Sequence, residues 1–310
     1  MRTLVVGAGA TGGFFGARLA QAGRDVTFLL RPGRVSALAS RGLRVHGLGR
    51  DDVIKPALVT RGELAGPYDL VLLAVKATAL AGAIDDMAPA VGEGTVIVPF
   101  LNGMAHMDAL NSRFGAERVL GGVVIVATTL GPDGDIIQLA PAASVTVGDQ
   151  PGGPERAAAA GAALSGAGFG VSVVPDIIAA MWSKWVFIAT VGALTCLMRG
   201  TIGDVVAVPG GADLGPAMLA EAVAVAAAAG YPVPAGSIAS TTATVTEPGS
   251  ASASSMYRDL AAGQPVEVEQ ILGDMVRRAR VLGVETPLLD LATAQLRVYQ
   301  HRLVSPPPAS

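Results

Sequence analysis

The sequence has few of the residues that build disulfide frameworks and metal centres. It holds one cysteine, Cys196, and three histidines without metal-ligand spacing, so we expect no internal disulfide and no metal site. Charged residues make up 15%, aromatic residues 4%, and the net charge is −3. Since hydrophobic residues make up 51%, the chain is not a disordered one, and its charge balance favours neither a nucleic-acid partner nor a polybasic membrane anchor.

Long uninterrupted apolar runs are also scarce. The apolar start of the chain is broken by glycines from Gly7 onward, before a signal-peptide core can form. The run Ile177 to Met198 is long enough to span a bilayer, but Ser183 and Lys184 interrupt it. We therefore expect no membrane partner, and the near absence of cysteine favours a reducing, cytoplasmic location.

The first half of the chain alternates short apolar runs with helical stretches. Strands are predicted at Thr3 to Val6, Asp25 to Leu30, Asp69 to Val75, Thr95 to Phe100, Val119 to Val126 and Gly170 to Val174. Continuous apolar runs separated by helices are typical of a parallel sheet covered on both faces. The pattern predicts an α/β fold with an N-terminal Rossmann-type, doubly wound parallel sheet. The stretch Gly134 to Gly148 is typical of a hairpin at an antiparallel edge.

After about Pro175 the strand pattern stops and helical stretches follow one another. They cover Ile177 to Met198, Asp213 to Ala229, Ser237 to Thr246, Ala251 to Ala262, Val266 to Leu282 and Pro287 to Leu303. We therefore expect a nucleotide-binding domain at residues 1–175 and a C-terminal all-helical domain at residues 176–304. The proline-rich end, residues 305–310, cannot continue a helix and is expected to be a flexible tail.

A glycine-rich loop follows the first strand directly and opens a helix. It reads Gly7-Ala8-Gly9-Ala10-Thr11-Gly12 and fits the G-x-G-x-x-G pattern in its required context of strand, helix and second strand. Gly7 permits a tight turn, Gly9 lets the backbone approach a pyrophosphate, and Gly12 lets the helix pack close to the sheet. The helix N-terminus adds unpaired N–H groups for the phosphates. The alternative is merely a tight turn, but the context favours dinucleotide binding by these six residues.

The end of the second strand distinguishes NAD from NADP. An NAD site places Asp or Glu there to accept hydrogen bonds from the ribose, whereas this chain has Leu29-Leu30-Arg31-Pro32-Gly33-Arg34. Arg31 can bind a 2′-phosphate through two parallel N–H groups. A solvated loop arginine is the alternative. The absent acid and the present arginine agree, so they favour NADP as the cofactor.

Lysine is scarce, since only three of the 22 basic residues are lysines. Lys76 ends the strand Asp69 to Val75, and strand carboxyl ends of an open α/β sheet face the ligand crevice. Lys184 lies between Trp182 and Trp185 in an apolar stretch, where burial should lower its pKa. Such a lysine can act as a general acid. A snorkelling side chain or a buried ion pair explains its position about equally well.

Three further polar residues each have an ordinary structural interpretation. Asn102 follows a strand, where it either faces the crevice or forms an ordinary Asn-Gly turn. Ser255, together with Ser254, fits a helix N-cap. Glu267 fits the solvated start of a helix. None of these residues identifies a function alone.

Taken together, these residues resemble the ketopantoate reductase (2-dehydropantoate 2-reductase) family over essentially the whole chain. The family has a glycine loop, an arginine after the second strand, a lysine after a later strand, an Asn-Gly pair and a catalytic lysine on the first long helix of its second domain. The matching residues are Gly7, Gly9, Gly12, Arg31, Lys76, Asn102-Gly103 and Lys184. A signature near the end matches Ser254-Ser255-Met256, Asp259, Gly263, Glu267 and Gly283-Val284-Glu285-Thr286-Pro287.

The resemblance implies an NADPH-dependent reduction of a 2-oxo acid. The default reaction is that of 2-dehydropantoate to pantoate, a step of pantothenate biosynthesis. It implies that Lys184 and Glu267 are catalytic, with Lys184 donating the proton. Lys76, Asn102 and Glu267 are implied to contact the cofactor, and Lys184, Asn102, Ser252 and Ser255 the substrate. The partner is then a small 2-oxo acid, and the sequence leaves open whether the chain forms a homodimer.

Three positions depart from the family pattern. Family asparagines one and two turns after the catalytic lysine align with Ile188 and Gly192, and a third aligns with Ser252. Residues four and eight apart share a helix face, so two polar contacts beside Lys184 are absent. One alternative is therefore a related reductase or dehydrogenase for a different 2-oxo or 2-hydroxy acid. A second is a non-catalytic NADP-binding sensor, for which the glycine loop alone would suffice.

Overall fold

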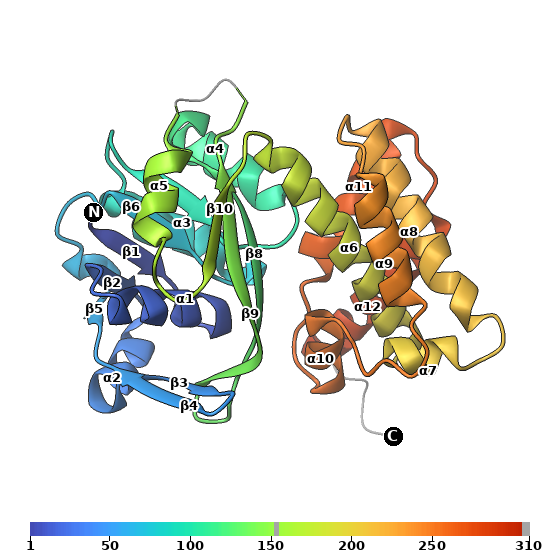
Figure 1. The fold of residues 1–310 in the computed structure, drawn as a ribbon, viewed down its shortest axis with the longest axis horizontal. Coiled ribbons are helices and arrows are strands. Elements are labelled where there is room, and N and C mark those ends of the chain that lie inside the picture. Colours follow the sequence, from blue (N-terminus) through green and yellow to red (C-terminus); the bar gives the residue numbers. More distant parts are fainter. Residues whose placement is uncertain (152–154, 306–310) are drawn as a thin grey trace. The chain divides into compact units, whose positions relative to one another are not determined.

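The chain divides into two units in a computed structural model that describes residues 1–151 and 155–305 (Figure 1). Unit 1 comprises Met1–Leu101 with His106–Ile178, and unit 2 comprises Asn102–Ala105 with Ala179–Ser310. The tail expected at residues 305–310 lies outside the described residues, apart from Ser305.

Unit 1 is built on a parallel sheet with the strand order β5-β2-β1-β6-β7. The strands are β1 (Thr3–Val6), β2 (Val26–Leu29), β5 (Ala57–Val59), β6 (Leu70–Leu73) and β7 (Val96–Pro99). Four of them, β1, β2, β6 and β7, are buried along their whole length, as expected for short apolar runs covered on both faces. Because the chain starts at the centre and winds outward in both directions, the predicted doubly wound Rossmann-type sheet is confirmed.

Helices alternate with these strands along the first half of the chain. They are α1 (Ala10–Gln21), α2 (Pro32–Arg41), α3 (Leu80–Met87), α4 (Ala105–Phe114) and α5 (Ala157–Leu164). Short 3-10 turns lie at Arg61–Glu63, Ala77–Ala79, Ala88–Ala90 and Ala116–Arg118. Helix α1 contacts strands of the parallel sheet and of a second sheet.

The second sheet of unit 1 mixes parallel and antiparallel strands. Its members are β3 (Leu43–Gly47), β4 (Arg50–Ile54), β8 (Gly121–Leu130), β9 (Ile136–Gly148) and β10 (Gly170–Val173). The strands predicted at Val119 to Val126 and Gly170 to Val174 exist, but they belong to this sheet. The hairpin predicted within Gly134 to Gly148 is wrong, because these residues form one long strand, β9, that pairs antiparallel with β8. The reversal comes earlier, at Gly131–Asp135, where Gly134 adopts φ +77.

The core of unit 1 explains why α1 begins where it does. Phe14 and Phe15 of α1 are buried, and the ring of Phe15 packs edge-on against Phe100 and Phe169, with centroids 5.4 and 4.8 Å away. A Cβ placed on Gly16 would lie 2.4 Å from the ring of Phe28 in β2, so helix and sheet are in close contact. This packing holds α1 closely against the sheet.

Unit 2 contains helices and, among its described residues, no strand. The helices are α6 (Ile177–Met198), α7 (Ile202–Val206), α8 (Gly211–Ala228), α9 (Ala235–Val245), α10 (Ser255–Ala261), α11 (Asp274–Leu282) and α12 (Pro287–Val304). A π-helical turn, η5 (Glu269–Gly273), precedes α11. The predicted helical character of this half is confirmed, while α7 and η5 are features that the sequence pattern did not predict.

Two of these helices, α6 and α8, are long and apolar enough to cross a membrane by length and composition alone. In α6, 67% of the most apolar window is buried inside the structure. Trp185, Ala189, Ala193 and Cys196 along this helix are at most 1% exposed. Most of the most apolar window of α6 is therefore packed inside the structure, which is typical of a core helix.

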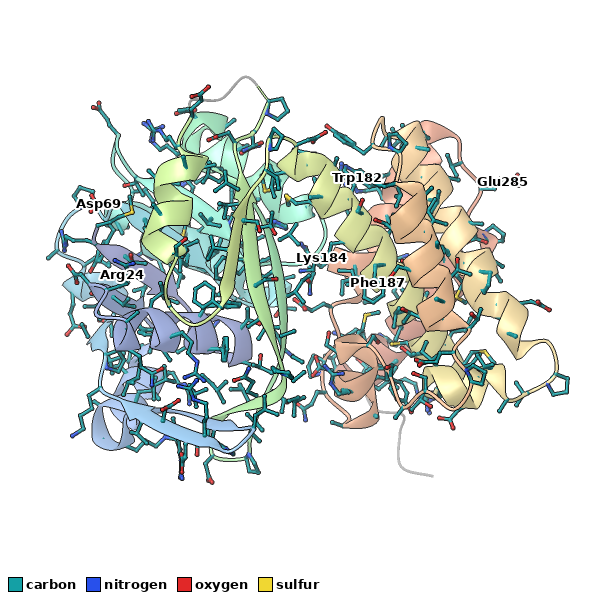
Figure 2. The ribbon with its side chains drawn as sticks, viewed as in Figure 1. Arg24, Asp69, Trp182, Lys184, Phe187 and Glu285 are labelled. Carbon is teal, nitrogen blue, oxygen red and sulfur yellow. The ribbon has the colours of Figure 1, made fainter. Side chains whose placement is uncertain are left out.

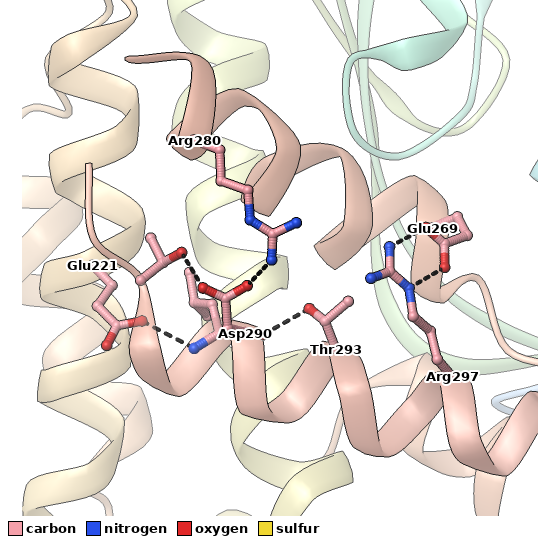
Figure 3. A network of polar contacts seen from close by, with 8 residues as sticks. Glu221, Glu269, Arg280, Asp290, Thr293 and Arg297 are labelled. Carbon is pink, nitrogen blue, oxygen red and sulfur yellow. Dashed lines mark hydrogen bonds and ion pairs between the residues drawn. The ribbon is translucent and has the colours of Figure 1, made fainter. Parts of the chain in front are cut away.

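Polar contacts fix α12 to its neighbours (Figure 3). The carboxylate of Glu221 in α8 accepts hydrogen bonds from the N–H groups of Leu288 and Leu289 at 3.0 and 2.9 Å. A carboxylate at this end of a helix also compensates the helix dipole. Further along, Arg297 donates two parallel hydrogen bonds of 2.7 Å to Glu269. Helix α12 is thereby linked to η5, which contains Glu269.

Candidate functional site

A pocket of about 500 Å³ lies in unit 1 at the carboxyl ends of β1, β2 and β6. Between β1 and β6 the chain reverses its direction of winding, which is where open α/β sheets bind ligands. Of the predicted cofactor residues, Gly7, Ala8, Gly9, Arg31 and Lys76 line this pocket. The remaining loop residues Ala10, Thr11 and Gly12 lie in the first turn of α1, behind the lining.

The glycines of the loop differ in what surrounds them. Gly7 has φ +96, and a Cβ there would lie 2.8 Å from the carbonyl oxygen of Ala74. A Cβ on Gly12 would lie 2.4 Å from the Gly7 oxygen and 2.6 Å from the Ala74 side chain. A Cβ on Gly9 would meet nothing within 4 Å. Gly7 and Gly12 are therefore required by the fold, whereas Gly9 keeps open the space in front of the backbone.

The first turn of α1 has no side-chain cap. Gly9 is its N-cap residue, so no side chain accepts hydrogen bonds from the first N–H groups. The first turn also holds no acidic residue. The open space at Gly9, the uncapped N–H groups and the positive end of the helix dipole suit a pyrophosphate.

Basic side chains surround the opposite side of the pocket. Arg31 is exposed and is the N-cap residue of α2. Arg34, one turn later, also lines the pocket, and its Nη2 donates to the oxygens of Ala8 at 3.3 Å and Gly134 at 2.9 Å. Burial lowers the pKa of Arg34. Sequence reasoning selected Arg31 and missed Arg34, although the spacing of three residues at a helix start was a usable signal.

Lys184 lies on α6 in unit 2, as does Trp182 (Figure 2). In the sequence it stands between two buried tryptophans. Trp182 and Trp185 are 2% and 1% exposed, and their ring centroids are 4.8 Å apart. The lysine keeps some contact with solvent, but the protein packed around its ammonium lowers its pKa to about 8. Desolvation is the sole cause of this shift, and none of the described residues forms an ion pair with it. The buried ion pair considered from the sequence is therefore absent in the described part of the chain.

Asn102 belongs to unit 2 by its contacts, as does Glu267. The main-chain oxygen of Asn102 accepts a hydrogen bond of 2.6 Å from Nε2 of Gln270 in η5. Glu267 lies just before that turn, and its oxygen accepts from the N–H of Ile271 at 3.1 Å. Both predicted residues are thus attached to η5. Sequence reasoning missed Gln270, and no pattern in the sequence marked it.

The predicted serines occupy the segment before α10. Ser254 is the N-cap residue, with its Oγ accepting from the N–H of Tyr257 at 2.9 Å. Ser255 begins the helix and is exposed, and Ser252 is exposed as well. The capping role considered from the sequence therefore falls to Ser254, which leaves the hydroxyl of Ser255 at the surface of unit 2.

The helix face that continues from Lys184 is apolar. Ile188, four residues on, is partly exposed, and Gly192, eight residues on, is buried. A Cβ on Gly192 would lie 2.9 Å from the terminal methyl group of Met256, the buried residue that follows Ser255. The methionine methyl thus fills the space that a side chain at position 192 would take.

Comparisons with known proteins agree over both units. The family model "Ketopantoate reductase PanE/ApbA" matches residues 3–152, and "Ketopantoate reductase PanE/ApbA C terminal" matches residues 176–300. An uncharacterized oxidoreductase of Bacillus subtilis (strain 168), YkpB, is 33% identical over 97% of this chain and 99% of its own. The crystal structure of 2-dehydropantoate 2-reductase from Methylococcus capsulatus superposes with a TM-score of 0.87 at 29% identity, covering 100% of both chains. A D-mandelate dehydrogenase solved with NADH and anilino(oxo)acetate has the same fold, with a TM-score of 0.88 at 22% identity over 98% of this chain and 99% of its own.

Proposed function

Because the chain belongs to the ketopantoate reductase family and is an oxidoreductase acting on a keto or hydroxyl group, we propose that it reduces a 2-oxo acid with NADPH. The default substrate is 2-dehydropantoate, which would place the enzyme in pantothenate biosynthesis. The observation that carries the proposal is Lys184, whose burial lowers its pKa to about 8. An ammonium of that acidity is an effective proton donor near neutral pH.

When bound, the nicotinamide of the cofactor would supply a hydride to the carbonyl carbon of the 2-oxo acid. Lys184 donates a proton from Nζ to the carbonyl oxygen as negative charge develops there, and solvent reprotonates the neutral amine. A desolvated ammonium stabilises developing negative charge more strongly than a solvated one. Glu267 is the second residue that we propose as catalytic, and it also contacts the cofactor. Asn102 contacts both the cofactor and the substrate, and Ser255 contacts the substrate.

The assignment of NADPH rests on the residues of unit 1. The end of β2 offers Leu30 and Arg31 where an NAD site has a carboxylate. Arg31, Arg34 and Lys76 provide three cations around the pocket, and guanidinium groups match the geometry of a 2′-phosphate. Asp86, the carboxylate that lines the pocket, forms a 3.5 Å ion pair with Arg61.

A second candidate is a reductase for a 2-oxo acid with an apolar side chain. It is favoured by the face of α6 beyond Lys184, where Ile188, Gly192 and the methyl group of Met256 offer no hydrogen bond. A buried substrate hydroxyl without a partner costs about 1–3 kcal/mol. Steady-state kinetics on 2-dehydropantoate and on 2-oxo acids with aliphatic or aromatic side chains would distinguish the two. A higher kcat/KM for an apolar acid would remove 2-dehydropantoate as the substrate.

Replacement of Lys184 tests the proposed chemistry against a non-catalytic NADP sensor. Lys184→Ala should lower kcat by about 10²–10⁴-fold while leaving NADPH binding within twofold. Lys184→Arg keeps the charge but cannot release a proton near neutral pH, so it should be nearly as inactive. Unchanged turnover in both variants would overturn the catalytic role. Absence of turnover in the unmodified protein with every 2-oxo acid tried, despite tight NADPH binding, would favour the sensor.

The cytoplasmic location and the homodimer stay predictions. Size-exclusion chromatography with light scattering on the full chain reads the oligomeric state directly.

A further inference from the structure

The π-helical turn η5 is an irregularity at the start of the helix that continues as α11. Residues Glu269–Gly273 form a turn with i→i+5 hydrogen bonding, and α11 continues from Asp274. A π turn carries one more residue than an α turn, hydrogen-bonds less well and is found mostly as single turns at functional sites. The turn contains no proline. Contacts from outside the helix must therefore hold it in this form.

The first such contact comes from α6. The indole Nε1 of Trp185 donates a hydrogen bond of 2.8 Å to the main-chain oxygen of Ile271, inside the turn. Trp185 is 1% exposed, so this N–H has no access to water as a substitute partner. Successive helix residues project about 100° apart. The bond therefore fixes the rotation of α6 about its axis at Trp185, and with it the direction of Lys184.

The second contact comes from the Asn102-Gly103 segment. Nε2 of Gln270 donates to the Asn102 oxygen at 2.6 Å. Gly103 has φ +76, and a Cβ there would lie 2.4 Å from the Gln270 oxygen. The two backbones are thus in direct contact, which only glycine permits at this position. The hydrogen bond uses the main chain of Asn102 and not its side-chain amide.

Two more observations place η5 at the centre of the candidate site in unit 2. Glu267 is bonded through its main-chain oxygen to the N–H of Ile271 at 3.1 Å, so its backbone is part of the same framework. On the outer side, Arg297 of α12 donates two hydrogen bonds of 2.7 Å to Glu269 (Figure 3). The turn is therefore held from α6, from α12 and from the Asn102 segment.

We propose that η5 is a positioning element that aligns three site residues at once: Lys184 through Trp185, Asn102 through Gln270, and Glu267 through its own chain. Trp185 and Gln270 are positioning residues and not catalytic ones, because they act through their neighbours. The inference rests on the roles proposed above for Lys184 and Asn102. It assigns a purpose to the consecutive residues Gln270 and Ile271, which contact the Asn102 segment and Trp185 respectively.

The test of the α6 contact is Trp185→Phe, which removes the indole N–H and keeps an aromatic ring. Its matched control is Trp182→Phe, a buried tryptophan of the same helix that stacks on Tyr231. Misalignment of a catalytic group by about 1 Å costs up to roughly a hundredfold in rate. Trp185→Phe should therefore lower kcat at least tenfold and leave the KM for NADPH within twofold of the wild-type value. Trp182→Phe should lower Tm by a similar amount but leave kcat within twofold of the wild-type value.

The pH profile of kcat separates misalignment from general destabilisation. Arg278 lies over the Trp185 ring at 5.8 Å, but no charged group contributes to the pKa of Lys184, which is set by desolvation alone. Loosening the packing beside Lys184 should therefore move the alkaline limb of Trp185→Phe to higher pH. Trp182→Phe keeps the hydrogen bond from Trp185 to Ile271, so its alkaline limb should move less than that of Trp185→Phe.

The Asn102 contact is tested by Gln270→Met, with Gln295→Met as control. The Oε1 of Gln295 is buried and has no hydrogen-bond partner among the described residues, so its loss should be neutral. Gln270→Met should lower kcat/KM for the 2-oxo acid about tenfold, with Gln295→Met within twofold of wild type. The positioning role would be overturned if Trp185→Phe and Trp182→Phe lowered kcat equally, or if the two glutamine variants lowered kcat/KM equally. In that case an inactive Lys184→Ala would still support the proposed function. Full turnover of Lys184→Ala would overturn both.

Discussion

Lys184 brings a positive charge into a part of unit 2 that desolvates it. Its pKa is about 8 in the folded protein and 10.5 in a solvated chain. Between those values the unfolded chain binds more protons, so the contribution of this group to stability rises as the pH rises from 8 to 10.5. Below about pH 8 the ammonium is charged in the folded protein, and its burial lowers the free energy of unfolding by roughly 1–3 kcal/mol after allowance for partial exposure. A destabilising residue that persists in a core helix is typical of a functional one.

This cost predicts that Lys184→Met stabilises the protein. At pH 7 the free energy of unfolding in urea should rise by about 1–3 kcal/mol, and the gain should shrink toward zero near pH 10.5. The exposed Lys55 is the control, because Lys55→Met removes a lysine that is already solvated. A Lys184→Met protein no more stable than wild type at pH 7 would show that the ammonium is not desolvated.

The glycine loop predicts opposite outcomes for two similar substitutions. Gly12→Ala should destabilise the fold by about 3 kcal/mol, because its Cβ meets a backbone oxygen at 2.4 Å and the Ala74 side chain at 2.6 Å. Gly9→Ala should leave Tm unchanged, because its Cβ meets nothing within 4 Å, yet weaken NADPH binding at least tenfold. Thermal unfolding and NADPH fluorescence titration measure the two effects. Unaltered NADPH affinity in Gly9→Ala would mean that the pyrophosphate does not approach this backbone.

Among the secondary-structure elements, those with an unambiguous pattern were predicted well. The strand at Thr3–Val6 and the helix at Ile177–Met198 match β1 and α6 residue for residue, because continuous burial leaves a continuous apolar run. The short strands β3, β4 and β5 were missed. Strand β4, Arg50–Ile54, contains Asp51 and Asp52, and its burial pattern shows no fully buried residue. An exposed edge strand of charged residues has no apolar periodicity to detect.

The site was predictable where it depends on local chain geometry and not where it depends on packing. The loop from Gly7 to Gly12 carries its own signature, and the position of Lys184 among tryptophans indicated burial. The hydrogen bond from Trp185 to Ile271 joins residues 86 positions apart, and that from Gln270 to Asn102 joins residues 168 apart. No local pattern encodes such pairs, and no helix propensity predicts the π turn that receives them.

The N-terminus of α2 predicts how the protein chooses its cofactor. Arg31→Ala should weaken NADPH binding at least tenfold, since a charged hydrogen bond to phosphate is lost, and should change NADH binding less than twofold. Arg41→Ala is the control, because Arg41 lies on the same helix but pairs with Asp135 at 3.0 Å and does not line the pocket. Equal losses for the two cofactors in Arg31→Ala would refute the assignment of the 2′-phosphate.

In the proposed function, unit 1 carries the nucleotide pocket and unit 2 carries the proton donor. The glycine loop, Arg31 and Lys76 belong to unit 1, while Lys184, Asn102, Glu267 and Ser255 belong to unit 2. Family models match both parts of the chain. We expect the substrate preference to be set in unit 2, where Ile188 and Gly192 continue the face of Lys184 on α6 and the methyl group of Met256 packs at Gly192.

The most direct test of this account is the pH dependence of kcat for 2-oxo acid reduction with saturating NADPH, in wild type and in Lys184→Ala with and without an added primary amine. Because the donor must be protonated, the wild-type kcat should be constant below about pH 8 and fall tenfold per pH unit above it. Lys184→Ala should lose this limb together with its activity, and a small primary ammonium ion should restore part of the rate. A wild-type profile that is flat from pH 6 to 10, or a Lys184→Ala enzyme with the wild-type profile, would contradict proton donation by Lys184.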